Sequence, residues 1–496
     1  MKTFALSKPF FPFTTIIVGF FLGSLIVVDH FLTNLIAQRI DLTINGLNIL
    51  KLYPYELSSL LFLFVVLLVV LQSIMRHFLT WTFTHIEKAF IILFLFSMNM
   101  VALTKISRID LSELLLFAFF FILLLKFSIE DKKIRISFIE ILNLLFISSL
   151  FISSMNAGIL SVPDYLLTSS KFVLILFLIT NFLYNRELLI FFLKCFVIIS
   201  TISAIIGIGQ EVLYVISGIP IVGFVDNDDM KFLFEPTSFG KLLRVPAFFR
   251  TYKPFTFFLN TAMLIIFNYF IYKRPFVLKM RLMLIFSFLL MFFALSLTFS
   301  KDALLAFSIG LILSTLIRWP FLIIHGFVLI FITIIAIYVF GFADDIQRTI
   351  STEIHCGEMR IRLQLGRDGI LGFVYKHPWI GVGVRDAARY TAHYLGWPTH
   401  NAFIMAADVA GISGLLTFLV LLFYTLLNIV KSNLLAQEIS DKWVASCLLS
   451  GFIATLIAIQ FHPFFLEHFT WLYMGVVQAY IMIAFREKNL RAVSLA

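Results

Sequence analysis

Apolar runs separated by short polar stretches follow one another along most of this chain. A helix that crosses a membrane needs roughly 20 mostly apolar residues, and the runs predict about 12 to 14 such helices. The predicted spans lie near residues 11–29, 57–75, 88–104, 111–127, 137–154, 168–184, 188–208, 254–272, 281–298, 302–318, 321–341, 402–430, 443–460 and 469–485. The pattern therefore predicts an all-α polytopic membrane protein.

Two longer polar stretches divide the chain into membrane-embedded parts and loops. Transmembrane helices are expected at 1–208, 254–341 and 401–496, and the two larger loops at 209–253 and 342–400. The first apolar run follows Lys2 and Lys8 but is not followed by a small-residue cleavage site. We therefore expect an uncleaved first span.

Composition supports a membrane location. Hydrophobic residues make up 61% of the chain and charged residues 13%, against about half and about a quarter in soluble proteins. The net charge of +10 comes from short basic clusters between the apolar runs. This pattern argues against nucleic-acid binding, which favours a sustained basic face. The three cysteines have neither metal-ligand nor disulfide spacing, and we expect no metal and no cofactor.

Short connections rich in Lys and Arg predict which side of the membrane each loop faces. Examples are "EDKKIR", "YKRPFVLKMR" and the tail "REKNLR". Because such connections stay in the cytoplasm, both chain ends are expected to be cytoplasmic. The two larger loops and the short junction "TFSKDA" then lie on the outer side, and we expect any chemistry at that membrane–water boundary.

Cations gather on the predicted outer side, where the positive-inside rule disfavours them. They are Arg244, Arg250 and Lys253 before the span at 254–272, Lys301 in the junction, and Arg360, Arg362 and Arg367 in the larger loop. A single cation of this kind often only snorkels to the interface, and Asp302 offers Lys301 an ion-pair partner. As a group, the cations suit a polyanion with an apolar tail, such as a lipid pyrophosphate, because guanidinium groups bind phosphate oxygens in pairs.

A His-Asn pair, His400 and Asn401, stands where the larger loop meets the span at 402–430. A neutral imidazole can take a proton from an acceptor hydroxyl near neutral pH, so His400 is a candidate general base. The alternative is a helix cap, because Asn is a favoured residue directly before the first turn of a helix.

Two other polar features have simpler explanations. Gly381 and Gly383 in "WIGVG" lack the spacing and the Lys-Ser/Thr of a phosphate loop, and they are expected to allow a tight turn. The acidic run "VDNDDM" has carboxylates that suit a divalent ion, but a solvated loop is the favoured interpretation.

Four sequence pieces stand out in a fixed order. They are "RVPAFFRTYKP", "TFSKDALLAF", "RIRLQLGRDGILGFVYKHPWIGVG" and "HNAFIMAADVAGISGLL". Together they resemble the O-antigen ligase family, which also includes O-antigen and exopolysaccharide polymerases. In the last piece, His-Asn is followed by a Gly-x-x-Gly that Gly411 and Gly414 match. The resemblance covers roughly residues 240–430.

The resemblance implies a membrane glycosyltransferase of the bacterial inner membrane. Such an enzyme moves a glycan from undecaprenyl pyrophosphate to an acceptor hydroxyl, for example on lipid A core, on the periplasmic side. By position the resemblance implies His400 as the catalytic histidine, Arg244 or Arg250, Lys301, and Arg360 or Arg362 as pyrophosphate ligands, and Asn401, Gly411 and Gly414 as positioning residues. Two departures stand out: "PA" replaces the family's glycine in the first piece, and the tryptophan usual after the loop arginine is missing.

Other functions are compatible with the same pattern. A polymerase of this family would extend the glycan on its lipid carrier, and a protein O-oligosaccharyltransferase would use a protein acceptor. A transporter would share the many-span hydropathy, but would place charged residues and paired interrupted helices near the middle of the bilayer.

Overall fold

The structure is a computed structural model whose described part is a helical framework. It describes residues 86–99, 105–106, 109–110, 116–121, 123, 137–156, 162–218, 220, 234–237, 240–249, 251–273, 277–322, 366–367, 370, 378–383, 401–436, 438–462 and 467–495.

Within these ranges, 7 helices are long and apolar enough to cross a membrane. They are Phe138–Met155, Arg186–Ser217, Tyr252–Lys273, Leu278–Leu297, Ala402–Leu435, Asp441–Ala458 and His468–Arg486. The predicted all-α polytopic class is therefore confirmed. The predicted total of about 12 to 14 spans and most of the loop at 342–400 fall on residues outside the described ranges and stay predictions.

One of the two compact units of the chain contains the described residues up to Leu115 and Lys194–Thr251. It includes α3 (Ile86–Asn99), the residues of α7 (Arg186–Ser217) from Lys194 onward and two short antiparallel hairpins. The hairpins pair β1 (Lys105–Ile106) with β2 (Ile109–Asp110), and β3 (Phe234–Thr237) with β4 (Gly240–Leu243). Glu211 on α7 accepts a hydrogen bond from the Leu243 backbone N–H at 3.1 Å, which ties β4 to this helix.

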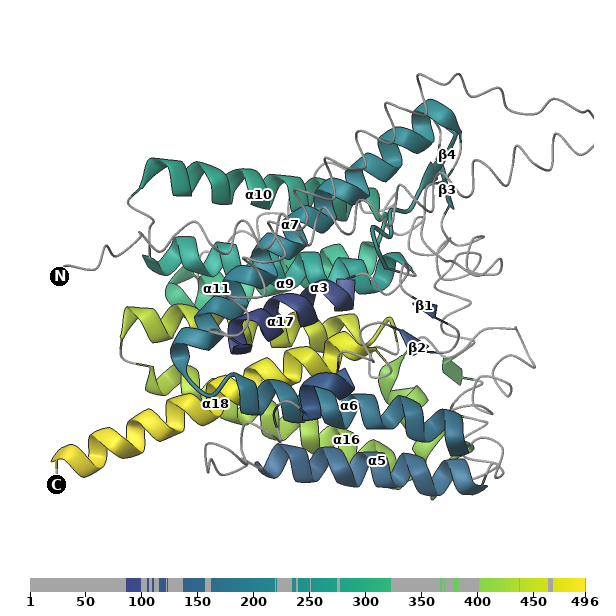
Figure 1. Ribbon diagram of the computed structural model, residues 1–496, viewed down its shortest axis with the longest axis vertical. Helices are drawn as coiled ribbons and strands as arrows, with labels where there is room; N and C mark the ends of the chain where they lie inside the picture. The colour runs from purple at the N-terminus through teal and green to yellow at the C-terminus, as the bar shows by residue number, and fades with distance from the viewer. Residues whose placement is uncertain are drawn as a thin grey trace, which may run out of the picture. The chain divides into compact units, whose positions relative to one another are not determined.

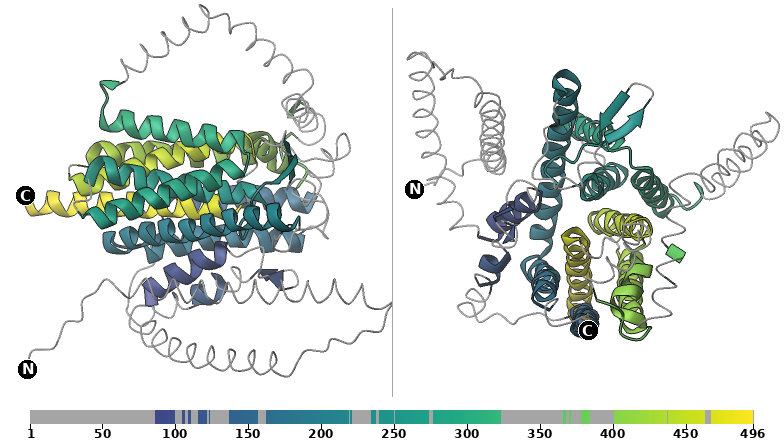
Figure 2. Two further views of the ribbon diagram at one scale, coloured as in Figure 1. Left: turned by 90° about the horizontal axis from the view of Figure 1, so that it is seen from above. Right: turned by 90° about the vertical axis from the view of Figure 1, so that its right-hand side faces the viewer.

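The other unit, Leu116–Leu193 with Tyr252–Ala496, is a bundle of packed helices (Figure 1). Its helices are α5 (Phe138–Asn156), α6 (Val162–Phe182), α9 (Tyr252–Lys273), α10 (Leu278–Leu297), α11 (Lys301–Arg318), α16 (Ala402–Leu435), α17 (Ile439–Ala458) and α18 (His468–Leu495), with the first turns of α7. The right-hand view of Figure 2 looks along the axes of most of these helices. We refer to this unit as the helical bundle.

A first layer of the helical bundle consists of α9, α11 and α17, which pack on one another. Gly310 on α11 leaves no room for a side chain, because a Cβ there would lie 2.8 Å from Leu264 on α9. Small residues allow such close approach between membrane helices. The Asn268 amide on α9 also donates to Ser314 on α11 at 2.9 Å and to Ser450 on α17 at 3.3 Å. Hydroxyl and amide groups of this kind link helices where water is absent.

A second layer consists of α5, α6, α16 and α18 and is held by stacked aromatic rings. Trp471 on α18 stacks on Phe172 of α6 at 5.4 Å and on Phe146 of α5 at 6.1 Å. Phe146 in turn stacks on Phe418 of α16 at 5.3 Å. All four side chains are buried, so this stack forms the core between the four helices.

The helix α10 contacts α9 but leaves most of its apolar surface uncovered. Only 22% of its membrane-spanning stretch is buried inside the protein. The helix lies at the edge of the helical bundle (Figure 1). Exposed large apolar side chains such as Leu282, Phe286 and Phe293 are the expected contact with lipid tails.

Candidate functional site

The junction between α10 and α11 is a tight turn of residues Thr298, Phe299 and Ser300. The Thr298 hydroxyl donates to the Leu295 carbonyl oxygen at 2.6 Å, which closes the end of α10. Phe299 has φ 52, in the left-handed region that non-glycine residues seldom adopt. Such a residue costs on the order of 1–3 kcal/mol and persists where its surroundings hold it. The predicted tight junction before Lys301 is therefore present.

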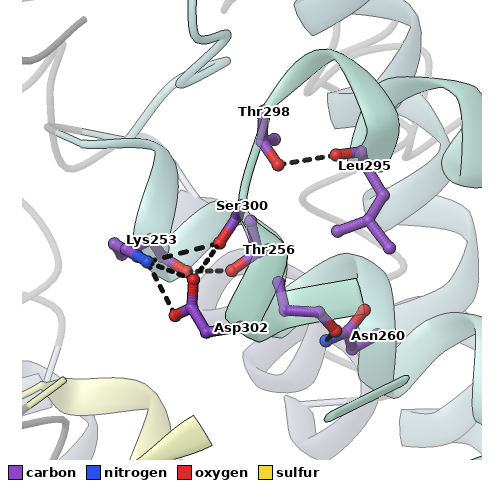
Figure 3. A network of polar contacts seen from close by, with 8 residues as sticks. Lys253, Thr256, Asn260, Leu295, Thr298, Ser300 and Asp302 are labelled. Carbon is purple, nitrogen blue, oxygen red and sulfur yellow. Dashed lines mark hydrogen bonds and ion pairs between the residues drawn. The ribbon is translucent and has the colours of Figure 1, made fainter. Parts of the chain in front are cut away.

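A buried ion pair joins this junction to α9. Lys253 Nζ lies 2.6 Å from each Asp302 carboxylate oxygen, and their side chains are 10% and 8% exposed. The Ser300 hydroxyl donates to Asp302 Oδ1 at 2.8 Å, as Figure 3 shows. The sequence offered Asp302 as the partner of its neighbour Lys301. The structure pairs Asp302 with Lys253, and Lys301 is exposed at the first position of α11.

A small cavity of about 10 Å³ lies beside this ion pair, between α9, α11 and α17. Its lining includes Asp302, Asn260 and, from the last turn of α17, Ala458. The cavity is large enough for about one water molecule. Because Asp302 and Ala458 share this cavity, the start of α11 and the end of α17 lie close together.

The end of α17 also holds Asn401, the residue after His400. The Ala402 backbone N–H donates to the Ile459 carbonyl at 2.9 Å, and the Asn401 amide donates to the Gln460 side chain at 3.1 Å. The Asn401 side-chain oxygen accepts from the backbone N–H groups of Phe403 and Ile404 at 2.9 and 3.1 Å. The proposed capping role of Asn401 is therefore confirmed, and the cap is anchored on α17.

The helix that follows is broken, so the span predicted at 402–430 is not one straight helix. Gly411 has φ 69 and ψ −170, which interrupts α16 and divides it into an arm, Ala402–Ala410, and a longer part, Ile412–Leu435. The rings of Phe403 and Phe418 lie 5.8 Å apart. In a straight helix, a rise of about 1.5 Å per residue would place these positions roughly 22 Å apart. The arm therefore folds back toward the longer part.

The segment Pro378–Gly383, which we call the strap, occupies the break. In an intact helix the Ile412 N–H would donate to the Asp408 carbonyl. Here it donates to the Pro378 carbonyl at 2.8 Å, while Asp408 and Val409 accept from the Val382 and Gly383 N–H groups at 2.9 and 3.0 Å. The strap thus supplies the hydrogen bonds that the break removes, as a membrane protein requires.

Two glycines make this contact possible by removing side chains from it. A Cβ on Gly381 would lie 2.5 Å from the Val409 backbone, and one on Gly411 would lie 2.3 Å from the Trp379 carbonyl oxygen. Gly414 leaves room for Ala410, because a Cβ there would lie 2.1 Å from the Ala410 Cβ. The tight turn predicted at Gly381 and Gly383 is present, with φ 82 and 80.

Gly411→Ala is expected to destabilise the protein, because it combines a positive φ with a backbone clash. The expected loss is at least about 1–3 kcal/mol, visible as a lower midpoint of thermal unfolding in detergent. Gly209→Ala on α7 is the matched control, since a Cβ there meets nothing within 4 Å. That variant should keep or slightly raise stability, by about 0.5 kcal/mol. Equal midpoints for the two variants would contradict the role of the break.

The structure places only part of the predicted site. Lys301, Asn401, Gly411 and Gly414 belong to the helical bundle, and Arg244 lies half-buried after β4 in the other unit. Arg250, Arg360, Arg362 and His400 lie outside the described residues. Sequence reasoning missed that Lys253 is the partner of Asp302 and that the two glycine motifs contact each other.

The match to a family model covers this same region. Residues 286–422 match the model described as O-Antigen ligase. Over these residues the chain is similar to the O-antigen ligase family. The matched residues run from α10 through the Lys301 junction and the strap to the longer part of α16. A comparison with curated proteins gives no match.

Proposed function

We propose that this protein transfers a glycan from undecaprenyl pyrophosphate to an acceptor hydroxyl on the periplasmic side of the bacterial inner membrane. The acceptor is lipid A core if the protein is a ligase, and a second lipid-linked glycan if it is a polymerase. His400 acts as the general base. The pyrophosphate ligands are Arg244, Arg250, Lys301, Arg360 and Arg362.

One observation supports the proposal most. Two elements of the helical bundle lie at the end of α17. One is the start of α11, which carries the exposed cation Lys301, and the other is the capped arm, which begins after His400. These elements come from separate motifs of the matched region 286–422. A cation close to the residue that follows the proposed general base in the sequence suits a reaction that expels an anion and removes a proton.

Charges at the other end of the helical bundle support an outward-facing site. The last turns of α9 and α11 carry Lys273 and Arg318, which lie over the rings of Trp443 and Tyr272 at 5.9 and 5.2 Å. Cations over interfacial aromatic rings are typical of the membrane boundary, and an excess of them favours the cytoplasmic side. The end that carries Asn401 then faces the periplasm.

The proposed reaction is a displacement at the anomeric carbon of the donor. His400 takes the proton from the acceptor hydroxyl, whose oxygen forms a bond to that carbon. The bond between the anomeric carbon and the pyrophosphate oxygen breaks, and its electron pair leaves with the pyrophosphate. The cations stabilise this developing charge. Attack from the side opposite the leaving group inverts the configuration at the carbon.

The broken helix does not favour a transporter. Interrupted helices in transporters lie near the middle of the bilayer and offer their free backbone groups to a substrate or an ion. Here the break lies near the start of α16, and the strap already binds the Asp408 and Val409 carbonyls and the Ile412 N–H. These backbone groups at the break are therefore hydrogen-bonded within the chain rather than offered to a substrate or an ion.

The direct test supplies the purified protein in lipid nanodiscs with an undecaprenyl-pyrophosphate-linked glycan and either lipid A core or no second acceptor. Glycosylated lipid A core identifies a ligase, and a longer lipid-linked glycan identifies a polymerase. Neither product, in a preparation that remains folded, contradicts the proposed function.

Transfer is expected to continue in excess EDTA. Pyrophosphate is a good leaving group, and the proposed arginine and lysine ligands supply the positive charge that a divalent metal would otherwise provide. Initial rates should be compared with and without the chelator, and again after excess Mg²⁺ is restored. A strict Mg²⁺ requirement would contradict this prediction and would direct attention to the acidic "VDNDDM" loop.

A further inference from the structure

Ser153 on α5 makes a hydrogen bond that serine in a helix rarely makes. A serine hydroxyl inside a helix usually donates to a carbonyl one turn earlier in the same helix. Ser149 does so, donating to the Leu145 carbonyl at 2.9 Å. Ser153, one turn later, instead donates across to the Val409 carbonyl of α16, and it is fully buried.

The Val409 carbonyl is the point at which three segments meet. It accepts from the Gly383 N–H of the strap at 3.0 Å and from the Ser153 hydroxyl of α5. A carbonyl oxygen has two lone pairs, so it can accept both hydrogen bonds. In an intact helix the same carbonyl would accept from Ser413. The break thus frees the carbonyl at the root of the arm, and Ser153 and the strap hold it.

We infer that Ser153 is a positioning residue for glycan transfer: it fixes the root of the arm whose tip carries Asn401 and, directly before it, His400. This inference rests on the proposed function. The tip is held on α17 by Ala402 and Asn401, and the root is held by Gly383 and Ser153. The direction of the arm therefore depends on both ends.

The length of the arm sets the size of the effect. With a rise of about 1.5 Å per residue, root and tip lie roughly 12 Å apart. A root that moves by about 1 Å then turns the arm by roughly 5°. Reacting groups misplaced by about 1 Å can lose on the order of 100-fold in rate. Because α17 still holds the tip, we expect a smaller loss of about tenfold.

The kinetic test compares Ser153→Ala with Ser149→Ala, the same substitution one turn earlier on α5. Initial rates of transfer are measured in nanodiscs over a range of lipid-linked donor concentrations. We expect Ser153→Ala to lower kcat about tenfold with an almost unchanged KM for the donor, because the interaction matters to the reacting geometry rather than to donor binding. Ser149→Ala should stay within about twofold of the wild-type kcat.

A second measurement reports the arm without requiring activity. Spin labels are placed on the arm at Ile404 and on the longer part of α16 at the exposed Leu427, in a chain whose Cys195, Cys356 and Cys447 are replaced by alanine. An unbroken helix would separate these positions by roughly 35 Å, and the folded-back arm gives a shorter distance. We expect Ser153→Ala to shift or broaden the distance distribution and Ser149→Ala to leave it unchanged.

The two measurements separate the inference from the function on which it rests. An unchanged distance distribution in Ser153→Ala overturns the positioning role, even if turnover falls. A raised donor KM with unchanged kcat overturns it as well. If the distance shifts in Ser153→Ala but the wild-type protein transfers no glycan, the proposed function is wrong. The conclusion that Ser153 fixes the position of the arm would still stand.

Discussion

Replacing His400 by alanine is expected to lower glycan transfer by at least about 100-fold while the protein stays folded. The loss follows from the role of a general base, because the acceptor hydroxyl then attacks without transferring its proton to a positioned group. Folding should survive, since the start of α16 is fixed by its neighbours. Asn401 caps the helix and binds Gln460, and Ala402 binds the Ile459 carbonyl.

The measurement is product formation by purified variants in nanodiscs, with size-exclusion elution and thermal unfolding as controls for folding. His400→Gln keeps the size and hydrogen bonding of the side chain but cannot act as a base, so it should be as inactive as His400→Ala. His77→Ala, in the predicted cytoplasmic connection "MRHF", should keep wild-type rates. Turnover of His400→Ala within about tenfold of the wild type would remove His400 from the mechanism.

Local signals in the sequence predicted the helical framework well. Apolar runs located the helices that the structure describes, because a membrane span must be long and apolar whatever it packs against. The cap at Asn401 and the tight turn before Lys301 were also predictable. A cap, a turn and a span each depend on residues that are close in the sequence.

Contacts between distant segments were not predictable in the same way. The Gly-x-Gly of the strap and Gly411 each predict an unusual backbone, but neither says that one packs against the other. Hydropathy measures apolar content, and the break at Gly411 does not change it. Hydropathy therefore predicted one continuous helix where the structure has two helical segments. The predicted span 402–430 was itself longer than the about 20 residues that a single crossing needs, which was a usable hint.

The ion pair at the start of α11 could have been assigned more sharply. Residues that follow each other in a helix point in different directions, so the buried Asp302 could have been expected to contact a residue on another helix as well. A buried charged residue near the end of a span is therefore expected to pair with a residue on another helix. Which one it is depends on how α9 and α11 pack, and that is long-range information.

Asp302→Ala is expected to be among the most destabilising single substitutions in the helical bundle. It leaves the Lys253 ammonium group buried without its carboxylate, and removing one partner of a buried ion pair costs about 3–5 kcal/mol. It also removes the acceptor of the Ser300 hydroxyl in the turn that holds Phe299 at a positive φ. We expect a markedly lower unfolding midpoint and a lower yield of folded protein.

The matched control is Asp441→Ala, which removes a carboxylate from the ion pair with Arg186 at the other end of the helical bundle. The side chains of that pair are 27% and 18% exposed, and Glu438 remains as a second carboxylate 3.7 Å from Arg186. The expected cost is below about 1 kcal/mol. A similar loss of stability in both variants would show that the burial of the Lys253–Asp302 pair does not increase the cost of removing its carboxylate.

The double variant Lys253→Met with Asp302→Asn separates the charge from the packing. Methionine fills the path of the lysine side chain without a charge, and asparagine still accepts from the Ser300 hydroxyl. Because an uncharged pair of similar volume is often as stable as a buried ion pair, the double variant should recover most of the stability that Asp302→Ala loses. If it unfolds as early as Asp302→Ala, the stability of this end of the bundle depends on the ionic contact itself rather than on avoiding a lone buried charge.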